Sequence, residues 1–91
     1  MVKINLGCGN KRIKGFIGGD KVKTEAVDII HNLDKFPYPF KDNSVDEIIM
    51  DNILEHLQDI IKVMEELHRI CKRNGVIKIY VPYAKSDGAF T

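Results

Sequence analysis

The chain has 91 residues, of which 44% are hydrophobic and 30% are charged, and its formal net charge is +1. This composition is typical of one ordinary soluble globular domain and argues against a disordered chain. No apolar run approaches the roughly 20 residues that cross a bilayer, and the N-terminus enters a strand pattern without a signal peptide. The nearly balanced charge disfavours nucleic-acid binding. We therefore expect a cytoplasmic protein that binds neither a membrane nor nucleic acid.

Apolar and β-branched segments predict five strands and one long helix. The expected strands are residues 2–6, 16–20, 26–30, 45–50 and 76–81. Between the last two strands, apolar residues recur every three or four positions from Leu57 to Cys71, which predicts an amphipathic helix. Asp59 is the expected N-cap of this helix, and Gly75 its expected left-handed stop after a basic last turn. Strands joined by crossovers predict an α/β fold around a mainly parallel, doubly wound sheet.

The run Asn5-Leu6-Gly7-Cys8-Gly9-Asn10 follows the first strand directly. Two glycines spaced Gly-x-Gly let the backbone turn sharply and approach a ligand, with amide groups left free for its polar atoms. Asp20 ends the second strand, where an acid can accept hydrogen bonds from a ribose diol. These features predict a nucleoside-cofactor site, although tight turns also use glycine and Asp20 suits a turn or a cap equally well.

Further side chains are expected at the carboxyl ends of the strands, where doubly wound sheets bind ligands. They belong to the loop after Ile30 and to Asp51-Asn52, which follows the fourth strand. Phe36 and Phe40 suit either the wall of an adenine site or a plug at the end of the core. We therefore expect one crevice that gathers residues from several strand ends.

The reactive side chains have less specific patterns. Cys8 is interpreted as a small residue in a tight loop rather than a nucleophile, since no partner base is evident. His56 is interpreted first as an anchor of a strand-to-helix turn and second as a general base. The cysteines and histidines do not have the spacing of a zinc site, so no metal is predicted. Motifs of serine hydrolases and phosphate-loop NTPases are missing from the sequence.

The order of motifs resembles that of the class I S-adenosylmethionine-dependent methyltransferases. The resemblance runs from Ile4 to Pro82, and its motifs are listed next. They are Asn5-Leu6-Gly7-Cys8-Gly9, Gly15-Phe16 leading to Asp20, Tyr38-Pro39-Phe40, Asp42-Asn43-Ser44-Val45-Asp46, Ile53-Leu54-Glu55-His56, Leu67-His68-Arg69-Ile70-Cys71-Lys72 and Asn74-Gly75. The resemblance implies a Rossmann-like fold and S-adenosyl-L-methionine as the cofactor.

The resemblance also implies roles for individual residues. The loop of Gly7, Cys8, Gly9 and Asn10, together with Asn5, would face the methionine end of the cofactor, and Asp20 would hold the ribose hydroxyls. Asn32, Leu33 and Asp34 would meet the adenine, and Asp51-Asn52 would face the methyl group. Asp51 and His56 are the candidate catalytic residues on position alone.

Three departures from the family pattern qualify these roles. Asn5 stands where many members have an acid, and Lys11 and Arg12 replace a further loop glycine, after which the usual helix is nearly missing. The family fold commonly continues with another helix and two more strands after the fifth strand. We therefore expect residues 1–91 to form a single methyltransferase-like domain, truncated and incomplete at its C-terminus.

Three functions follow from these observations. The first is methyl transfer from S-adenosylmethionine to a small-molecule acceptor. The second is a catalytically incomplete cofactor-binding module that needs a partner chain. The third is a dinucleotide-binding dehydrogenase, which is disfavoured because Arg12 occupies the place of the third glycine in Gly-x-Gly-x-x-Gly. We also expect a homodimer through strand 76–81 or helix 57–71, because an exposed apolar edge strand pairs readily with other chains.

Overall fold

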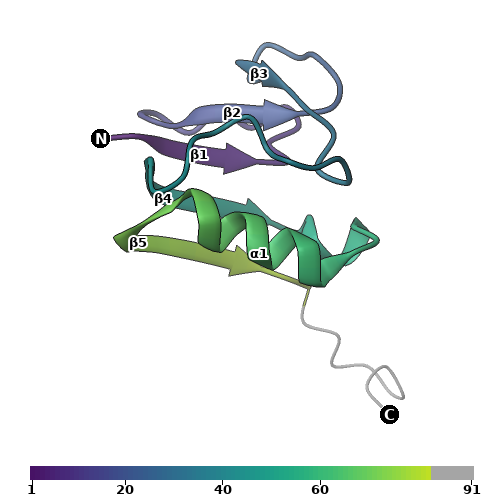
Figure 1. Ribbon diagram of the computed structural model, residues 1–91. Helices are drawn as coiled ribbons and strands as arrows, with labels where there is room; N and C mark the ends of the chain where they lie inside the picture. The colour runs from purple at the N-terminus through teal and green to yellow at the C-terminus, as the bar shows by residue number, and fades with distance from the viewer. Residues whose placement is uncertain (83–91) are drawn as a thin grey trace.

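The computed structural model describes residues 1–82, which form a five-stranded sheet with one α-helix and one short 3-10 helix (Figure 1). The elements are β1 Lys3–Leu6, β2 Ile17–Asp20, β3 Ile29–Ile30, β4 Val45–Asp51, η1 Leu54–His56, α1 Ile60–Ile70 and β5 Cys71–Tyr80. Neither helix of this part of the chain is long and apolar enough to cross a membrane. The expected incompleteness after the fifth strand concerns residues 83–91, which lie outside the described range.

All strands run parallel, in the order β3-β2-β1-β4-β5. The chain starts in the middle of the sheet with β1, adds β2 and β3 on one side, and then crosses over to add β4 and β5 on the other. The strand order therefore reverses between β1 and β4. In open α/β sheets, ligands bind beyond the carboxyl ends of the strands at such a reversal. This topology confirms the predicted α/β fold with a Rossmann-like, doubly wound, parallel sheet.

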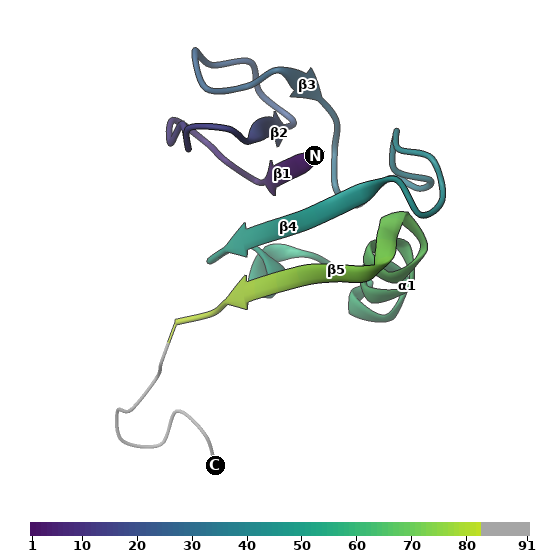
Figure 2. The ribbon, with the colours of Figure 1, turned by 90° about the vertical axis from the view of Figure 1, so that its left-hand side faces the viewer.

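The hydrophobic core lies between α1 and one face of the sheet (Figure 2). Three α1 side chains, Val63, Leu67 and Ile70, are spaced by four and three positions and therefore share one face of the helix. They are 0% exposed, as are the side chains that they meet on the sheet, from Ile4 in β1 and Ile48 and Met50 in β4. Burying side chains of this size stabilises the fold by roughly 1.5–3 kcal/mol each.

Loops replace helices on the other face of the sheet. Residues 7–16 connect β1 to β2 and residues 21–28 connect β2 to β3, both without a helix. A small buried cluster of Cys8, Ala26 and Val27 packs there. Gly18 fits beneath it because an added Cβ would lie 2.0 Å from the Ala26 carbonyl oxygen. In residues 1–82, the helical cover of the sheet is thus confined to the face that α1 occupies.

Three predicted boundaries were wrong by a few residues. The fifth strand begins at Cys71 rather than at residue 76. The α-helix begins at Ile60 rather than Leu57, although Asp59 is its N-cap as predicted and accepts a hydrogen bond from the Lys62 amide at 3.1 Å. The third strand spans only Ile29–Ile30 rather than residues 26–30. Its apolar beginning is buried in a loop instead, where the Asp28 carboxylate accepts a hydrogen bond from the Gly18 amide at 2.8 Å.

The predicted stop of the helix at Gly75 was also wrong. The helix ends at Ile70, because the amides of Asn43 and Ser44 donate to the last carbonyls, of Arg69 and Ile70, at 2.9 Å each. With these carbonyls satisfied, the chain turns directly into β5 at Cys71. Gly75 does not have a left-handed backbone; it is required because an added Cβ would lie 2.5 Å from the Cys71 sulfur.

Candidate functional site: two cavities that meet at the glycine loop

The loop after β1 turns at two glycines with left-handed backbones. Gly7 has a φ of +74° and Gly9 a φ of +55°, a conformation that glycine adopts without the steric cost that a Cβ brings. At Gly7 the space is restricted as well, since an added Cβ would lie 2.4 Å from Cγ1 of Ile53. Ile53, two positions after the end of β4, therefore packs directly onto the glycine loop.

The amides of Gly7, Cys8 and Gly9 are not free, contrary to the prediction. The amides of Gly7 and Cys8 both donate to the Gly19 carbonyl, at 2.7 and 3.2 Å. The Gly9 amide donates to the Asp20 carboxylate at 2.7 Å. The hydrogen bonds of the loop thus fix its shape against the end of β2, and side chains must supply most of the polar contacts to a ligand.

Asp20 fixes the backbone of two loops, as one of the two interpretations of the sequence predicted, and it also borders a cavity. One carboxylate oxygen accepts from the Gly9 amide and the other from the Lys21 amide, each at 2.7 Å. An ionised carboxylate has about four acceptor positions, so two remain. Asp20 is half-buried and lines a cavity, which leaves these positions available to hydroxyl donors there.

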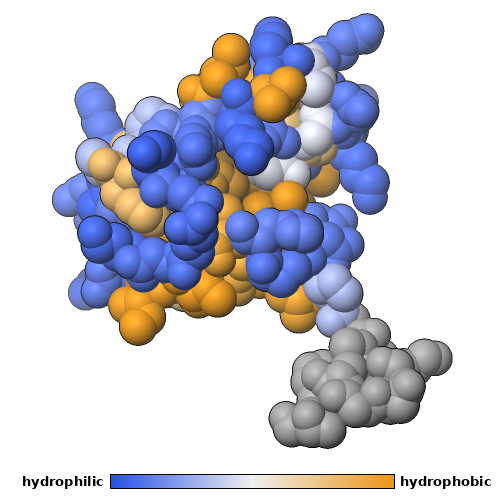
Figure 3. Space-filling view, turned by 90° about the vertical axis from the view of Figure 1, so that its right-hand side faces the viewer, coloured by the Kyte–Doolittle hydropathy of each residue, from blue (hydrophilic) through white to orange (hydrophobic). Residues whose placement is uncertain are grey.

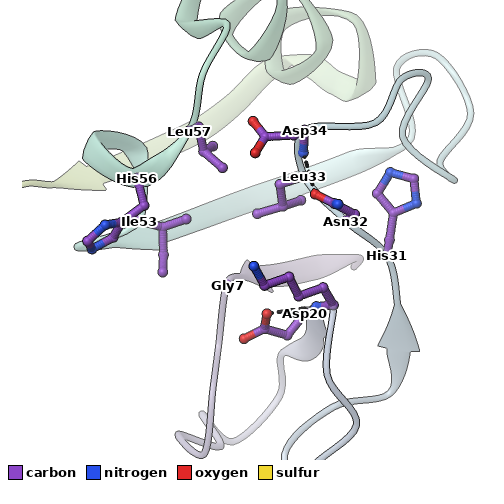
Figure 4. A pocket seen from close by; sticks show the side chains of 10 residues that line it. Gly7, Asp20, His31, Asn32, Leu33, Asp34, Ile53, His56 and Leu57 are labelled. Atoms are coloured by element: carbon purple, nitrogen blue, oxygen red, sulfur yellow. Dashed lines mark hydrogen bonds between the residues drawn. The ribbon is translucent and has the colours of Figure 1, made fainter.

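The first cavity has a volume of about 260 Å³ and lies between the ends of β1 and β2, the loop after β3 and the segment after β4 (Figure 4). Its lining residues are Gly7, Asp20, Lys21, His31, Asn32, Leu33, Asp34, Ile53, His56 and Leu57. The predicted ribose and adenine residues therefore meet in one place. Three apolar side chains, Leu33, Ile53 and Leu57, supply a nonpolar wall.

Hydrogen bonds between loops hold this wall in place. The Asp34 carboxylate accepts from the Gln58 amide at 3.0 Å and so ties the β3–β4 loop to the segment before α1. The Asn32 side-chain oxygen accepts from the Asp34 amide at 2.9 Å, as drawn in Figure 4. The hydroxyl of buried Tyr38 donates to the Leu33 carbonyl at 2.8 Å. These three hydrogen bonds tie together the loops that surround the cavity.

The second cavity, of about 250 Å³, lies on the other side of Gly7 and ends at β4. Its lining residues are Asn5, Gly7, Cys8, Lys11, Ile13, Asp51 and Asn52. Asn5 is only 4% exposed, and within residues 1–82 no hydrogen bond uses its side chain. Within residues 1–82 no side-chain nitrogen or oxygen is both buried and without a hydrogen-bond partner, so the side-chain amide of Asn5 remains accessible from the cavity that it borders.

A pair of opposite charges borders the same cavity. The Lys11 Nζ lies 3.8 Å from an Asp51 carboxylate oxygen, and both side chains retain substantial exposure. Asn52, the next residue, has a left-handed backbone with a φ of +58°, which is uncommon outside glycine and recurs at functional sites. Its amide donates to the Tyr80 carbonyl at 2.7 Å, so pairing with β5 helps to hold this conformation.

The structure does not bring the two candidate catalytic residues together. Asp51 lines the second cavity and His56 the first. The His56 side chain is 73% exposed, and its Nε2 lies 3.7 Å from the neighbouring Glu55 carboxylate. Asn10, a predicted cofactor ligand, is exposed and lines neither cavity.

The environment of Cys8 agrees with a packing role. Its thiol is buried and directed at the Ala26 carbonyl, at 3.6 Å. Burial, and next the charge of Asp20, raise the pKa of the Cys8 thiol, which disfavours the nucleophilic thiolate. Within residues 1–82, no group of three His, Cys, Asp or Glu side chains could hold a metal ion.

Other residues of the site had weaker signals in the sequence. Phe36 and Phe40 pack against the core and do not line the first cavity. Ile53 and Leu57 form its wall instead, and both were overlooked. Their apolar character alone could not distinguish them from core residues, whereas the need for glycine at position 7 reflects the contact with Ile53.

Comparison with known families agrees with this geometry. A family model described as a methyltransferase domain matches residues 8–79. This chain belongs to the class I S-adenosylmethionine-dependent methyltransferases. The methyltransferase match begins within the glycine loop and ends within β5, so it includes most of the lining of both cavities. No curated protein and no solved structure matches the chain. The family assignment sets aside the dehydrogenase alternative, which also required a helix after the glycine loop.

Proposed function

We propose that this methyltransferase binds S-adenosylmethionine across both cavities and transfers its methyl group to a small-molecule acceptor. The observation that carries the proposal is the pair of cavities of similar volume on either side of Gly7. One contains a hydroxyl acceptor beside an apolar wall, and the other contains a cation and a carboxylate. A nucleoside joined to an amino acid has the same division of chemistry.

The first cavity suits the adenosine half. An adenine ring would pack against Leu33, Ile53 and Leu57, where burial of apolar surface contributes about 25 cal/mol per Å². The ribose diol would donate to the two remaining acceptor positions of Asp20. Hydrogen bonds to a charged group contribute about 1.5–3 kcal/mol, so Asp20 is expected to be the strongest single polar contact on this side.

The second cavity suits the methionine half, which ends in an ammonium and a carboxylate group. Asp51 offers a negative charge to the ammonium group and Lys11 a positive charge to the carboxylate. Lys11 and Asp51 form one ion pair with each other, at 3.8 Å. A bound zwitterion would replace this pair by two, one between Asp51 and its ammonium group and one between Lys11 and its carboxylate. Asn5, which replaces the usual family acid, would contribute hydrogen bonds without a charge. Asp51 thus compensates for the missing acid at position 5.

S-adenosylmethionine supplies an activated methyl group on a sulfonium, so the protein chiefly has to position donor and acceptor. The rigid loop at Gly7 and the Asn52 backbone would fix the region between the two cavities. No side chain is required to act as a base in this arrangement. Asp51 lines the second cavity, and a direct part for Asp51 or His56 in catalysis stays a prediction.

Calorimetry with S-adenosylmethionine and its demethylated product tests the binding step. Asp20→Asn should lower affinity by about 10- to 100-fold, because the variant loses charged hydrogen-bond acceptors. Asp59→Asn is the matched control, since asparagine is an equally good N-cap and Asp59 lines neither cavity. No binding by the folded wild-type chain at millimolar ligand would refute the proposal.

A second titration separates the two halves of the site. Lys11→Met should weaken binding of S-adenosylmethionine by several-fold but leave 5′-methylthioadenosine unaffected, because that ligand lacks the amino acid end. Lys14→Met makes the same change in the same loop away from both cavities. Equal losses for both ligands would contradict the assignment of Lys11 to the methionine end.

Turnover against a broad panel of small-molecule acceptors tests the transfer step. Product formation by the chain alone supports the proposed enzyme. Cofactor binding without turnover would favour the alternative of an incomplete module that a partner chain completes.

A further inference from the structure

We infer that Arg69 is a positioning residue for the adenosine half of the cofactor, although it lines neither of the two cavities. It acts through Tyr38, whose side chain supports the loop of residues 31–34. The inference rests on the proposed function, because that function places the adenine against this loop. Arg69 and Tyr38 both lie outside the lining of the two cavities, so their effect on the ligand is indirect.

All five N–H donors of the Arg69 guanidinium are in use. Nε and Nη2 donate to the two carboxylate oxygens of Glu66, at 2.9 and 2.8 Å, and Nη1 donates to the Asp42 carboxylate at 2.7 Å. The two remaining donors reach backbone carbonyls, of Phe40 at 2.9 Å and of Tyr38 at 3.1 Å. Because a guanidinium holds its five donors in a fixed plane, Arg69 at the end of α1 fixes the course of the loop before β4, which runs beside it (Figure 2).

The backbone of Tyr38 is held from both sides. Its carbonyl accepts from Arg69, and its amide donates to the Glu66 carboxylate at 2.6 Å. Arg69 also lowers the pKa of Glu66, so at neutral pH the acceptor of this amide is charged and forms the stronger hydrogen bond. The side chains of Arg69 and Glu66 are only 28% and 14% exposed. Two residues of α1 thus fix the point from which the Tyr38 side chain extends.

The Tyr38 side chain reaches the wall of the first cavity from behind. It is 2% exposed, and its ring meets the edge of the His31 ring with centroids 5.5 Å apart. Its hydroxyl donates to the Leu33 carbonyl at 2.8 Å. His31 and Leu33 both line the first cavity, on the loop drawn in Figure 4. A displacement of Tyr38 would therefore move two lining residues at once.

The apolar wall of this cavity is sensitive to small displacements. Figure 3 faces the side of the molecule at which the strand arrows of Figure 1 end, and it shows apolar atoms between polar side chains there. Leu33, which is 7% exposed, belongs to the wall. A gap of about 0.5–1 Å already removes a substantial part of a dispersion contact. A loosely held Leu33 should therefore bind an adenine ring less tightly.

Calorimetry with 5′-methylthioadenosine tests the inference on the adenosine half alone. Tyr38→Phe removes the hydroxyl and keeps the ring, whereas Arg69→Lys keeps the charge but offers three donors in place of five. Each variant should lower the affinity by about two- to tenfold, and S-adenosylmethionine should lose the same factor because its methionine half is untouched. Unchanged affinities in both variants would overturn the inference. No binding by the folded wild-type chain would refute the proposed function and the inference with it.

Ile70→Val is the control for a general loss of stability. Ile70 is fully buried at the end of the same helix, and the loss of one methylene there has a cost similar to that of one hydrogen bond. The variant should lower the urea midpoint and leave both affinities unchanged. A purely structural role for Arg69 would make Arg69→Lys behave like this control.

Two further measurements test the path from Arg69 through Tyr38. In a double-mutant cycle, Arg69→Lys combined with Tyr38→Phe should lose less affinity than the product of the two single losses, and fully multiplicative losses would overturn the path. Hydrogen exchange of the ligand-free chain needs no cofactor and so separates this inference from the proposed function. The Lys35 amide, which donates to the Asn32 carbonyl at 2.9 Å, should exchange about two- to tenfold faster in Arg69→Lys but not in Ile70→Val. Unchanged exchange in Arg69→Lys would overturn the inference whatever the ligand.

Discussion

The sheet has two lateral halves, one formed by β4 and β5 and the other by β1, β2 and β3, and they are stabilised in different ways. On the side of β4, α1 and β5, a single helix buries large aliphatic side chains, and Val45, Val63, Leu67 and Ile70 are 0% exposed. On the side of β1, β2 and β3, short loops replace helices, and carboxylates hold the backbone in place through the Asp20–Gly9 and Asp28–Gly18 hydrogen bonds.

This difference shows how a small chain can combine a packed core with an open site. The helical half supplies the stability that burial of apolar surface gives, whereas the loop half leaves both cavities open beside Gly7. A site made of hydrogen-bonded loops depends on individual glycine and aspartate residues. We therefore expect substitutions in the helical half to unfold the protein and substitutions in the loop half to act first on the site.

The largest effect is expected from Leu67→Ala in α1. Leu67 is fully buried, and truncation of such a leucine costs about 2–5 kcal/mol, a large part of the 5–15 kcal/mol that typically stabilises a domain. Urea denaturation followed by circular dichroism measures the loss. Met64→Ala on the same helix is the control, because Met64 is 41% exposed and should lose much less. Similar losses for both variants would contradict the assignment of the core.

The next largest effect is expected at the glycine loop. Gly9→Ala should cost about 1–2 kcal/mol, the penalty of a left-handed backbone for a residue with a Cβ. Gly7→Ala should cost more, because its Cβ would also collide with Ile53, and it should weaken cofactor binding most.

The collision at Gly7 can be tested by a double-mutant cycle. Gly7→Ala should be less harmful in an Ile53→Ala background, with a coupling of about 0.5–3 kcal/mol. Thermal denaturation of the four proteins measures this coupling. Additive losses would show that Ile53 does not restrict position 7.

A smaller effect is expected at the start of α1. Asp59→Ala removes the N-cap hydrogen bond to Lys62 and should lower the free energy of unfolding by about 1 kcal/mol. Asp59→Asn should be nearly neutral. Denaturant unfolding of the two variants distinguishes a capping role from a general effect of charge, which would make both variants equally unstable.

The smallest effects are expected from acid. The Arg69 guanidinium holds the pKa of Glu66 below its usual range, and Arg12 does the same for the pKa of Asp28 on the other side of the sheet. Each folded-state pKa lies below the unfolded value, so the stabilisation is complete above about pH 5 and is lost as the pH falls below about 4.

Hydrogen exchange resolved by residue can separate these two contributions. Glu66→Gln should reduce the acid sensitivity of α1 amides, and Asp28→Asn should reduce that of the loop between β2 and β3. Each variant serves as the control for the other. If both halves respond alike to either change, the two sides of the sheet unfold as one unit.

The strands and the helix could largely be predicted from the sequence, because they depend on patterns among neighbouring residues. Alternation and β-branched residues located three of the strands to within one residue at both ends, and Asp59 was recognised as a cap. The errors arose where tertiary contacts replaced a local signal. Asn43 and Ser44 cap the helix from a distant loop, so Gly75 was not needed as a stop.

The candidate site divides in the same way. The order of motifs in the sequence predicted that Asp20, Asn32, Leu33 and Asp34 lie at one site, and these residues do line one cavity. The sequence could not show that Ile53 and Leu57 complete the apolar wall, or that Lys11 reaches Asp51. Such contacts join segments about 40 residues apart, and no local pattern encodes them.

The sequence by itself therefore determined the family, the parallel α/β topology and the glycine–aspartate pair at the strand ends, because each depends on neighbouring residues or on motif order. Only the tertiary structure decided that the amides of Gly7, Cys8 and Gly9 are paired within the chain, that two cavities flank Gly7, and that Asp51 and His56 border different cavities. These properties depend on the distances between segments remote in the chain. Packing sets those distances, and the spacing of residues along the sequence does not.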